Sequence, residues 1–454
     1  MNKKLSVGDK LKFGVGDFGL AVISALLQFY MLFFYTDVVG IKPGLAGTAI
    51  LVGKITWDMV NDVLFGYLED KTKSRWGRRR PYLIFGAVPL MLAFWLLLSV
   101  PEGLDGVPAF LTIIGTFILF DTFHTLVATA YSAMTAEITE DYDERTSVST
   151  YRMVFSIIGY LLGAGVTAVL ADILSSTFGM TVKDAWGMVG LIYGAIAAIT
   201  ILIPGLFLKT PIVVEAKPTQ LPPVKAILST LKNKPFTKFL VISMIMSTAF
   251  TMVTTMLPYY LIYQLDMADS QIIVMFLMLG TLAVFLVPCS MMSGKIGKAK
   301  TYALGIIIAG VALACGFLLP QGQSTLIFFL AAIVGLGFSS QWVCPHSMMP
   351  DVIEYDELET GERREGIYYG MNATAGKITG ALGSALCGWG LEWFGYVEGA
   401  VQSEGALLAI RGLFALIPAL LLLVCVPLLL RYPVTRESHE KVLEELRARR
   451  EGKK

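Results

Sequence analysis

Long apolar runs separated by short polar segments are the feature that most constrains how this chain can fold. Hydrophobic residues make up 55% of its 454 residues and charged residues only 16%, compared with roughly 25% charged residues in an average soluble domain. The charges are clustered, because 71–80 holds six basic residues while 82–100 holds none. This pattern excludes a disordered chain and an ordinary soluble enzyme, and the formal net charge of +1 gives no reason to expect a nucleic-acid partner.

A helix needs about 20 apolar residues to cross a bilayer, and the runs are long enough for twelve such helices. We therefore expect an all-α integral membrane protein. Gly, Pro and charged residues break the sequence into these spans: 17–38, 44–66, 82–100, 108–133, 150–174, 185–208, 237–263, 269–292, 300–319, 324–347, 365–395 and 404–431.

Basic residues are unevenly divided between the two sides of these spans. With the amino terminus inside, the outer loops contain only Lys42 and Lys183 as basic residues, whereas the inner segments contain the cluster at 71–80 and the basic tail. The positive-inside rule then predicts that both termini are cytoplasmic. We expect a multi-pass protein of the cell (inner) membrane that retains its first apolar segment and functions as a monomer among membrane lipids.

A polar, Pro-rich and basic segment near the middle of the chain predicts two six-helix bundles. We expect them at 1–208 and 237–431, joined by a cytoplasmic linker at 209–236 and followed by a cytoplasmic tail at 432–454. An internal repeat supports the division, because Gly77 and Gly297 follow the second span of each half within similar basic loops. Parallel halves of this kind are typical of major-facilitator transporters, whose substrate sites lie near the bilayer midplane.

The sequence offers no pattern for covalent catalysis or for a bound cofactor. The five cysteines have no CxxC spacing, which argues against a zinc site. A G-x-G-x-x-G match at 14–19 follows no strand and opens a membrane span, so the dinucleotide-binding interpretation fails. We expect no enzyme activity and no cofactor, apart from a coupling cation.

Ionisable residues inside the spans are costly and therefore mark candidate functional positions. Lys54, Asp58 and Asp62 are spaced four apart and predict one stripe on a helix, with Asn61 beside it. Two neighbouring carboxylates at membrane depth require a cation or a proton between them, and oxygen ligands suit a hard cation such as Na⁺. The alternative is a structural Lys–Asp ion pair with a second, protonated Asp.

Further charged residues lie in the fourth, fifth and eleventh spans. Asp121 and His124 are three apart and can share a helix face, where a His beside a carboxylate can relay protons; a neutral His bonded to a helix carbonyl is the alternative. Arg152 and Lys377 belong to different halves. We expect their charges to meet acids or substrate in a central cavity.

The loop 70–80 suggests a cytoplasmic gate as well as a positive-inside anchor. Its charged residues can pair with acidic segments that follow the fourth and tenth spans in one state of a transport cycle and release them in the other. The predicted gate residues are Asp70, Arg75, Arg78, Asp351, Glu354 and Arg363.

Five segments together resemble the glycoside-pentoside-hexuronide:cation symporters of the major facilitator superfamily, in particular the melibiose permease-like members. The resemblance extends along nearly the whole chain and implies the major-facilitator fold and cation-coupled transport. The segments are 34–38 (FYTDV), 57–62 (WDMVND), 74–78 (SRWGR), 350–355 (PDVIEY) and 363–370 (RREGIYYG).

The resemblance also implies roles for individual residues. Asp58, Asn61 and Asp62 fall on cation ligands, and His124 stands where the family has a Thr ligand. The metal interpretation is a Na⁺ ion at Asp58 and Asp62, with H⁺ as the other candidate for the coupling cation.

Four positions are implied in sugar binding by the same resemblance. Arg152, Trp342 and Lys377 fall on positions that line or support the sugar site, and Tyr131 takes the place of an aromatic residue there.

The chain departs from the family where the sugar-binding carboxylates are expected, because Ala21 and Val127 occupy those positions. Asp17 and Asp121 lie on the same helices and can supply displaced acids. We expect symport of a sugar, glycoside or uronide; the alternative is an amphiphile such as a lysophospholipid, which the two apolar replacements would suit.

Overall fold

The computed structural model is all-helical. It describes residues 5–72, 74–101, 103–104, 106–138, 142–208, 230–361 and 364–451. Contacts divide the chain into two units. The first comprises the described parts of Met1–Lys217 together with Asp269–Ile272 and Ser384–Ala406; the second comprises the described parts of Pro218–Ala268, Ile273–Gly383 and Leu407–Lys454.

The first unit is built mainly from the helices of the amino-terminal half, within which α1 packs against α6 and α8, α4 against α5 and α8, and α2 and α3 against α5. Its elements are α1 (Val7–Phe33), the π-helical turn η1 (Phe34–Val38), α2 (Pro43–Gly53), the π-helical turn η2 (Lys54–Asp58), α3 (Met59–Lys71), α4 (Arg80–Leu97), α5 (Gly106–Ile138), α6 (Tyr142–Gly165), α7 (Thr167–Phe178) and α8 (Val182–Phe207).

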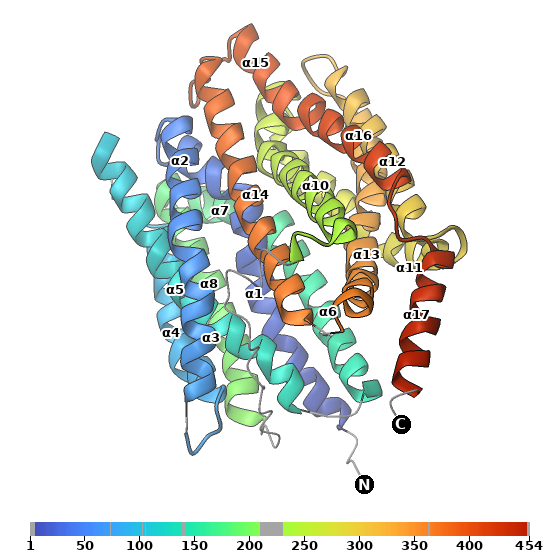
Figure 1. Cartoon of the computed structure of the whole chain (residues 1–454). Helices are drawn as coiled ribbons and strands as arrows, with labels where there is room; N and C mark the ends of the chain where they lie inside the picture. Colours follow the sequence, from blue (N-terminus) through green and yellow to red (C-terminus); the bar gives the residue numbers. More distant parts are fainter. Residues whose placement is uncertain are drawn as a thin grey trace. The chain divides into compact units, whose positions relative to one another are not determined.

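The second unit contains most of the later helices, with α12 packed against α13 and α16, and α10 against α16. Figure 1 shows the short helix α17 at the carboxyl end of the chain. The elements that follow α8 are α10 (Lys234–Tyr259), η3 (Tyr260–Gln264), η4 (Ala268–Ser270), α11 (Gln271–Ile296), α12 (Lys298–Phe317), α13 (Leu326–Thr360), α14 (Glu365–Trp393), α15 (Glu404–Arg411), η5 (Gly412–Leu416), α16 (Ile417–Leu430) and α17 (Arg436–Glu451).

Nine helices in the described part of the chain are long and apolar enough to cross a membrane, or ten if the bent pair α6–α7 forms one span. The segment α2–η2–α3 and helix α14 are not among them. Both carry ionisable residues within their predicted spans, such as Asp62 and Lys377, and these lower the apolar character on which such a test depends. The expectation of an all-helical membrane protein is confirmed, while the number of twelve spans stays a prediction.

Small residues bring α6 against α1 and so place their polar side chains. Gly159 and Gly163 are four apart, and a Cβ atom at either would collide with the carbonyl oxygen of Phe18 or Val22 on α1. Helices in lipid commonly approach each other through such pairs of small residues. The close contact fixes the register of α6 on α1 near Asp17 and Arg152.

The two loops of the predicted repeat share an unusual backbone conformation. Gly77 and Gly297 both have φ of +94°, in a region that residues with a Cβ rarely adopt. The two glycines therefore form equivalent turns, one after α3 in the first half and one after α11 in the second.

Helix α14 contributes to both units. Its residues up to Gly383 belong to the second unit, and its last part, from Ser384, belongs to the first. Gly388 lies so close to α2 that an added Cβ would collide with the carbonyl oxygen of Pro43. The predicted boundary between the bundles lies at 209–236, of which 209–229 fall outside the described residues.

Candidate functional site

An ion pair between α1 and α6 is the centre of the candidate site in the first unit. Arg152 donates from Nε to Asp17 Oδ2 at 2.5 Å and from Nη2 to Asp17 Oδ1 at 3.1 Å. The same guanidinium donates from Nη1 to Thr135 Oγ1 at 2.5 Å. Two parallel bonds to one carboxylate hold the planar guanidinium in a single orientation, so Arg152 is a preorganised donor.

Tyr131 on α5 completes this group. Its hydroxyl donates to the carbonyl oxygen of Phe13 at 2.5 Å and lies 3.3 Å from Asp17 Oδ2. The Arg152 guanidinium lies over the Tyr131 ring, with 4.7 Å between Cζ and the ring centroid. Gly16 makes room for this ring, since a Cβ there would approach it to 2.6 Å. The structure thus brings together three of the six predicted substrate residues: Asp17, Tyr131 and Arg152.

A second polar contact joins α3 to α5. The Asn61 amide nitrogen donates to both the main-chain oxygen and Oδ2 of Asp121, each at 2.9 Å, and both side chains are buried. Asn61 Oδ1 is also buried, and it accepts no hydrogen bond from a described residue. A buried amide oxygen without a donor, on the helix face that register assigns to Asp58 and Asp62, has the chemistry of a ligand for a hard cation.

The other predicted cation residues are described only in part. The side chain of Asp58 lies outside the described residues. Asp62 and His124 are half-buried and each has interactions with its surroundings, and the His124 ring lies 5.3 Å from that of Phe120. Lys54 begins the π-helical turn η2; such turns are frequent at functional sites.

Two predicted substrate residues, Trp342 and Lys377, belong to the second unit. Trp342 on α13 is 40% exposed and Lys377 on α14 is half-buried. Both have interactions with neighbouring groups. The structure does not assemble them with the Asp17–Arg152 pair inside one unit.

Two of the predicted gate residues lie in an ion-pair network of the second unit. Lys298 Nζ lies 2.7 Å from both carboxylate oxygens of Asp351 and donates to the carbonyl oxygen of Ser347 at 2.8 Å. His439 Nε2 of α17 lies 2.5 Å from Glu354 Oε2 and 3.6 Å from Asp351 Oδ1. Ligand atoms of these two acids and the His can come within reach of one metal ion, but Lys298 already occupies Asp351. In this structure the two acids hold α12 and α17 against α13.

The remaining predicted gate residues are placed less fully. Arg75 lies over the Trp76 ring, 4.9 Å from its centroid, and Arg78 is half-buried with interactions of its own. The side chain of Asp70 and the whole of Arg363 lie outside the described residues. Pairing of these groups across the transport cycle stays a prediction.

Two buried ion pairs escaped the sequence reasoning. Glu69 on α3 lies 2.5 Å from Arg79 Nη1 and accepts from Thr129 Oγ1 at 2.6 Å, while Asp356 binds Arg364 through bonds of 2.6 to 2.9 Å. All four charged residues stand near span ends, where charged side chains are usually exposed to solvent. The available signal was the short separation of opposite charges across a predicted turn, ten residues in the first pair and eight in the second.

A contact that joins η1 and α2 to the end of α14 and the turn after it, here termed the α2–α14 clasp, was also not predicted. Apart from close helix packing, it consists of three hydrogen bonds made by six residues. Trp389 Nε1 donates to Thr48 Oγ1 at 2.9 Å, the main-chain nitrogen of Gly44 donates to Glu392 Oε2 at 2.7 Å, and the Tyr396 hydroxyl donates to Asp37 Oδ1 at 2.5 Å. Gly44, Gly47 and Gly388 were its signal in the sequence, because small residues allow helices to pack closely.

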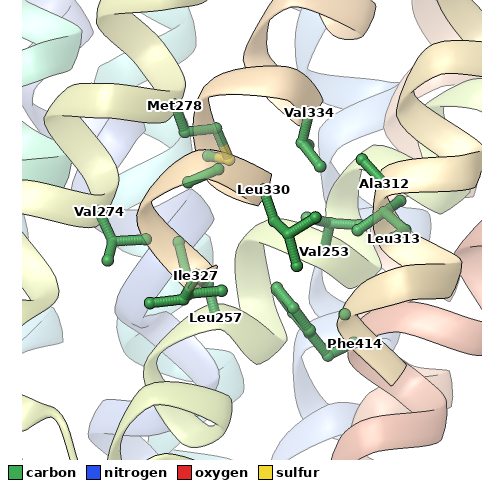
Figure 2. A pocket seen from close by; sticks show the side chains of 12 residues that line it. Val253, Leu257, Val274, Met278, Ala312, Leu313, Ile327, Leu330, Val334 and Phe414 are labelled. Atoms are coloured by element: carbon green, nitrogen blue, oxygen red, sulfur yellow. The ribbon is translucent and has the colours of Figure 1, made fainter. Parts of the chain in front are cut away.

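A small cavity in the second unit offers no polar group to a solute. It has a volume of about 20 Å³, and Figure 2 shows the aliphatic side chains, Met278 and Phe414 that line it. A volume near that of one water molecule, without hydrogen-bonding groups, marks a dry packing gap. The polar groups of the first unit remain the better candidate for solute binding.

Comparison with known proteins agrees with the resemblance seen in the motifs. The profile described as MFS/sugar transport protein matches residues 12–436. The isoprimeverose transporter of Lactiplantibacillus pentosus is 28% identical over 90% of this chain and 85% of its own length. The inner membrane symporter YicJ of Escherichia coli is 28% identical over 97% and 95%.

Solved structures share the fold at low sequence identity. The nucleoside transporter NupG aligns with a TM-score of 0.63 at 13% identity, over 93% of this chain and 99% of its own. A bacterial homologue of the human drug peptide transporters PepT1 and PepT2 aligns with a TM-score of 0.67 at 13% identity, over 94% and 98%. The expectations of a multi-pass membrane protein and of a transporter rather than an enzyme are confirmed, and the chain belongs to the MFS/sugar transport protein family.

Proposed function

We propose that the protein is a symporter that couples entry of a sugar, glycoside or uronide to the gradient of a cation, Na⁺ or H⁺. The observation that carries the proposal is the Asp17–Arg152–Tyr131 group. A fixed guanidinium, a carboxylate and an aromatic ring within one cluster are the groups that bind hydroxyls and carboxylates of a carbohydrate and stack on its apolar face. The names of relatives, such as the isoprimeverose transporter and the glucuronide carrier protein homolog of Escherichia coli, support this class of solute.

In this proposal Arg152 donates hydrogen bonds to the solute, and Asp17 accepts hydrogen bonds from the hydroxyl groups of the solute. The bidentate pair sets the direction of the free N–H groups before the solute arrives, which lowers the ordering cost of binding. Trp342 and Lys377 contribute from the second half, as the resemblance implies. Asp121 stays with Asn61, at the level of the cation.

The cation is proposed to bind at Asp58, Asn61 and Asp62, with His124 nearby. The unmatched Oδ1 atom of Asn61 supports this assignment, because a buried acceptor without a donor is costly unless a cation or water meets it. Coupling then requires that cation and solute raise each other's affinity by the same factor.

The proposed architecture has twelve spans in two six-helix bundles, with both termini cytoplasmic. On that orientation the α2–α14 clasp lies at the outer side, where it must open for the solute to enter. Alternating access by rocking of two repeats about a central site follows the general scheme of such transporters.

Uptake by purified protein in vesicles tests the proposal. Labelled pentosides, hexosides, hexuronides and a lysophospholipid are each offered under an inward Na⁺ gradient, an inward H⁺ gradient or no gradient. We expect accumulation of one carbohydrate class under one gradient. Gradient-independent movement, or accumulation of the lysophospholipid alone, would contradict sugar symport.

Variants of the proposed cation site give the matched comparison. Asp58→Asn and Asp62→Asn are expected to abolish accumulation against a gradient. Asp172→Asn on α7 removes one exposed carboxylate from the same unit and is expected to leave accumulation unchanged. Equal loss in all three variants would assign the effect to folding rather than to cation binding.

A further inference from the structure

A cavity of about 570 Å³ lies in the second unit, away from the candidate solute site. It is bordered by the turn between α11 and α12, the end of α16 and the start of α17. Cavities of this size hold small molecules or their head groups in other proteins. None of its lining residues belongs to the candidate solute site, although Asp351 belongs to the predicted gate.

The cavity lies where membrane-spanning segments end. Helix α11 ends at Ile296, α12 begins at Lys298 and α16 ends at Leu430, and all three residues line it. These helices are apolar enough to span a bilayer. The convergence of three span ends places the cavity at the level of the lipid head groups.

Positive charge dominates among the charged residues that line this cavity. Lys295, Lys298 and Lys300 line it against the carboxylates of Asp351 and Glu437. Lys298 and Asp351 neutralise each other through their 2.7 Å contacts. Lys295 and Lys300 are exposed, so they leave an excess positive charge over Glu437.

Main-chain and hydroxyl donors add to this charge. The amides of the first turn of α12 have no acceptor within the helix, and its N-cap, Gly297, brings no side chain to satisfy them. Tyr432 also lines the cavity, and its buried hydroxyl finds no hydrogen-bond partner among the described residues. A phosphate oxygen is a suitable acceptor for both kinds of donor.

Apolar side chains line the cavity as well. Ile296 and Leu430, which are 45% and 64% exposed, lie there with Leu429 and Met348. A soluble anion gains nothing from these side chains, whereas a lipid that places its phosphate near the lysines can lay its glycerol and first methylenes on them. The combination of basic groups with an apolar wall at the head-group level favours a lipid over free phosphate.

We propose that this cavity is a binding site for the head group of an anionic phospholipid. Its phosphate lies between Lys295 and Lys300, at the first turn of α12, and the acyl chains leave past Ile296 and Leu430. The lipid then bridges the α11–α12 turn and the start of α17. The site is independent of the identity of the transported solute.

Native mass spectrometry of the purified full-length protein tests this site, with added dioleoyl phosphatidylglycerol or dioleoyl phosphatidylcholine. Each lysine near a membrane surface contributes about fivefold in affinity for an anionic lipid. The double variant Lys295→Gln/Lys300→Gln is therefore expected to bind phosphatidylglycerol about thirtyfold more weakly. The control Lys232→Gln/Lys234→Gln makes the same charge change at exposed lysines outside the cavity and is expected to lose less than threefold.

Three results would overturn the proposal. They are equal binding of the two lipids by the wild-type protein, equal loss in the cavity and control variants, and displacement of phosphatidylglycerol by millimolar inorganic phosphate, which would indicate a site for soluble anions. If the double variant fails to fold, the single variants Tyr432→Phe and Lys295→Gln take its place, since each removes only one group from the cavity. A preference for phosphatidylglycerol that is unchanged in both single variants would also reject the site.

Discussion

Removing the Asp17 carboxylate is expected to destabilise the first unit, because it leaves the Arg152 guanidinium without its main partner. The variant Asp17→Asn keeps the size of the side chain and removes its charge. It abolishes the ionic character of both bonds from Arg152, which are 2.5 and 3.1 Å long. Thr135 and the Tyr131 ring remain as weaker partners.

The size of the effect follows from burial of the pair. Breaking a buried ion pair by removing one partner costs about 3–5 kcal/mol, whereas an exposed pair contributes about 0–1 kcal/mol. The Arg152 and Asp17 side chains are 19% and 18% exposed, so we expect about 2–3 kcal/mol. At about 2–4 °C per kcal/mol for a unit of this size, the melting temperature should fall by about 5–10 °C.

A double-mutant cycle on thermal unfolding in detergent separates this interaction from other effects of the substitutions. Asp17→Asn, Arg152→Gln and the double variant are compared with the wild-type protein. Because the two residues act on each other, the double variant should lose no more than the worse single variant. Asp9→Asn, on the same helix, serves as control, since its pair with Lys12 is exposed; it should change the melting temperature by less than about 3 °C.

Additive losses in the double variant would refute this reasoning. Coupling below about 0.5 kcal/mol is the value expected of independent sites. Such a result would mean that Arg152 is held by Thr135 and the aromatic rings, and that Asp17 is free to serve only as an acceptor for solute.

Two further variants test how the helices pack and how the outer contact responds to pH. Gly159→Ala should destabilise the protein by about 1–3 kcal/mol, since the added Cβ would collide with a main-chain oxygen of α1. The control Gly115→Ala places its Cβ in open space and should leave stability unchanged. Thermal unfolding measures both variants. Partial burial, and then the neighbouring Asp37, raise the pKa of Glu398. Asp37 also accepts the Tyr396 bond of the α2–α14 clasp, so Glu398 lies beside that contact. The protein should therefore lose stability as the pH rises from the ordinary glutamate value through the raised pKa, and Glu398→Gln should remove that part of the pH dependence of the melting temperature.

Much of the fold could be predicted because the apolar composition of a segment indicates whether it can span a membrane. Helices must satisfy every backbone group in lipid, so apolar runs predict them directly, and the repeat of Gly77 in Gly297 predicted a shared turn whose φ values agree. The partition into contact units could not be predicted. It depends on how Gly388 of α14 meets α2, and a close approach between distant helices leaves only scattered small residues in a sequence.

The sequence could predict which residues belong to the candidate site, but not which of them contact each other. An ionisable residue in a span marks itself by its rarity, which singled out Asp121 and Arg152, whereas Asp17 was named only as a substitute for a carboxylate that the family resemblance leads one to expect. Which acid faces Arg152 depends on the rotation of α6 against α1, and apolar periodicity is a weak guide where helices are surrounded by lipid on one side and protein on the other. Glu69 and Arg79 were missed for the opposite reason, because charges at span ends are usually solvated.

The same type of backbone turn is followed by a different ion pair in each repeat, and this difference bears on which loop can rearrange. After Gly77, Arg79 binds Glu69 of α3, and their side chains are 9% and 1% exposed. After Gly297, Lys298 binds Asp351 of α13, and their side chains are 35% and 10% exposed. Separating the first pair leaves two charges without water, at a cost of several kcal/mol, while the Lys298 ammonium can exchange its partner for solvent at a lower cost. During a transport cycle we therefore expect the α11–α12 turn to change its contacts, with the α3–α4 turn carried as a fixed part of its unit.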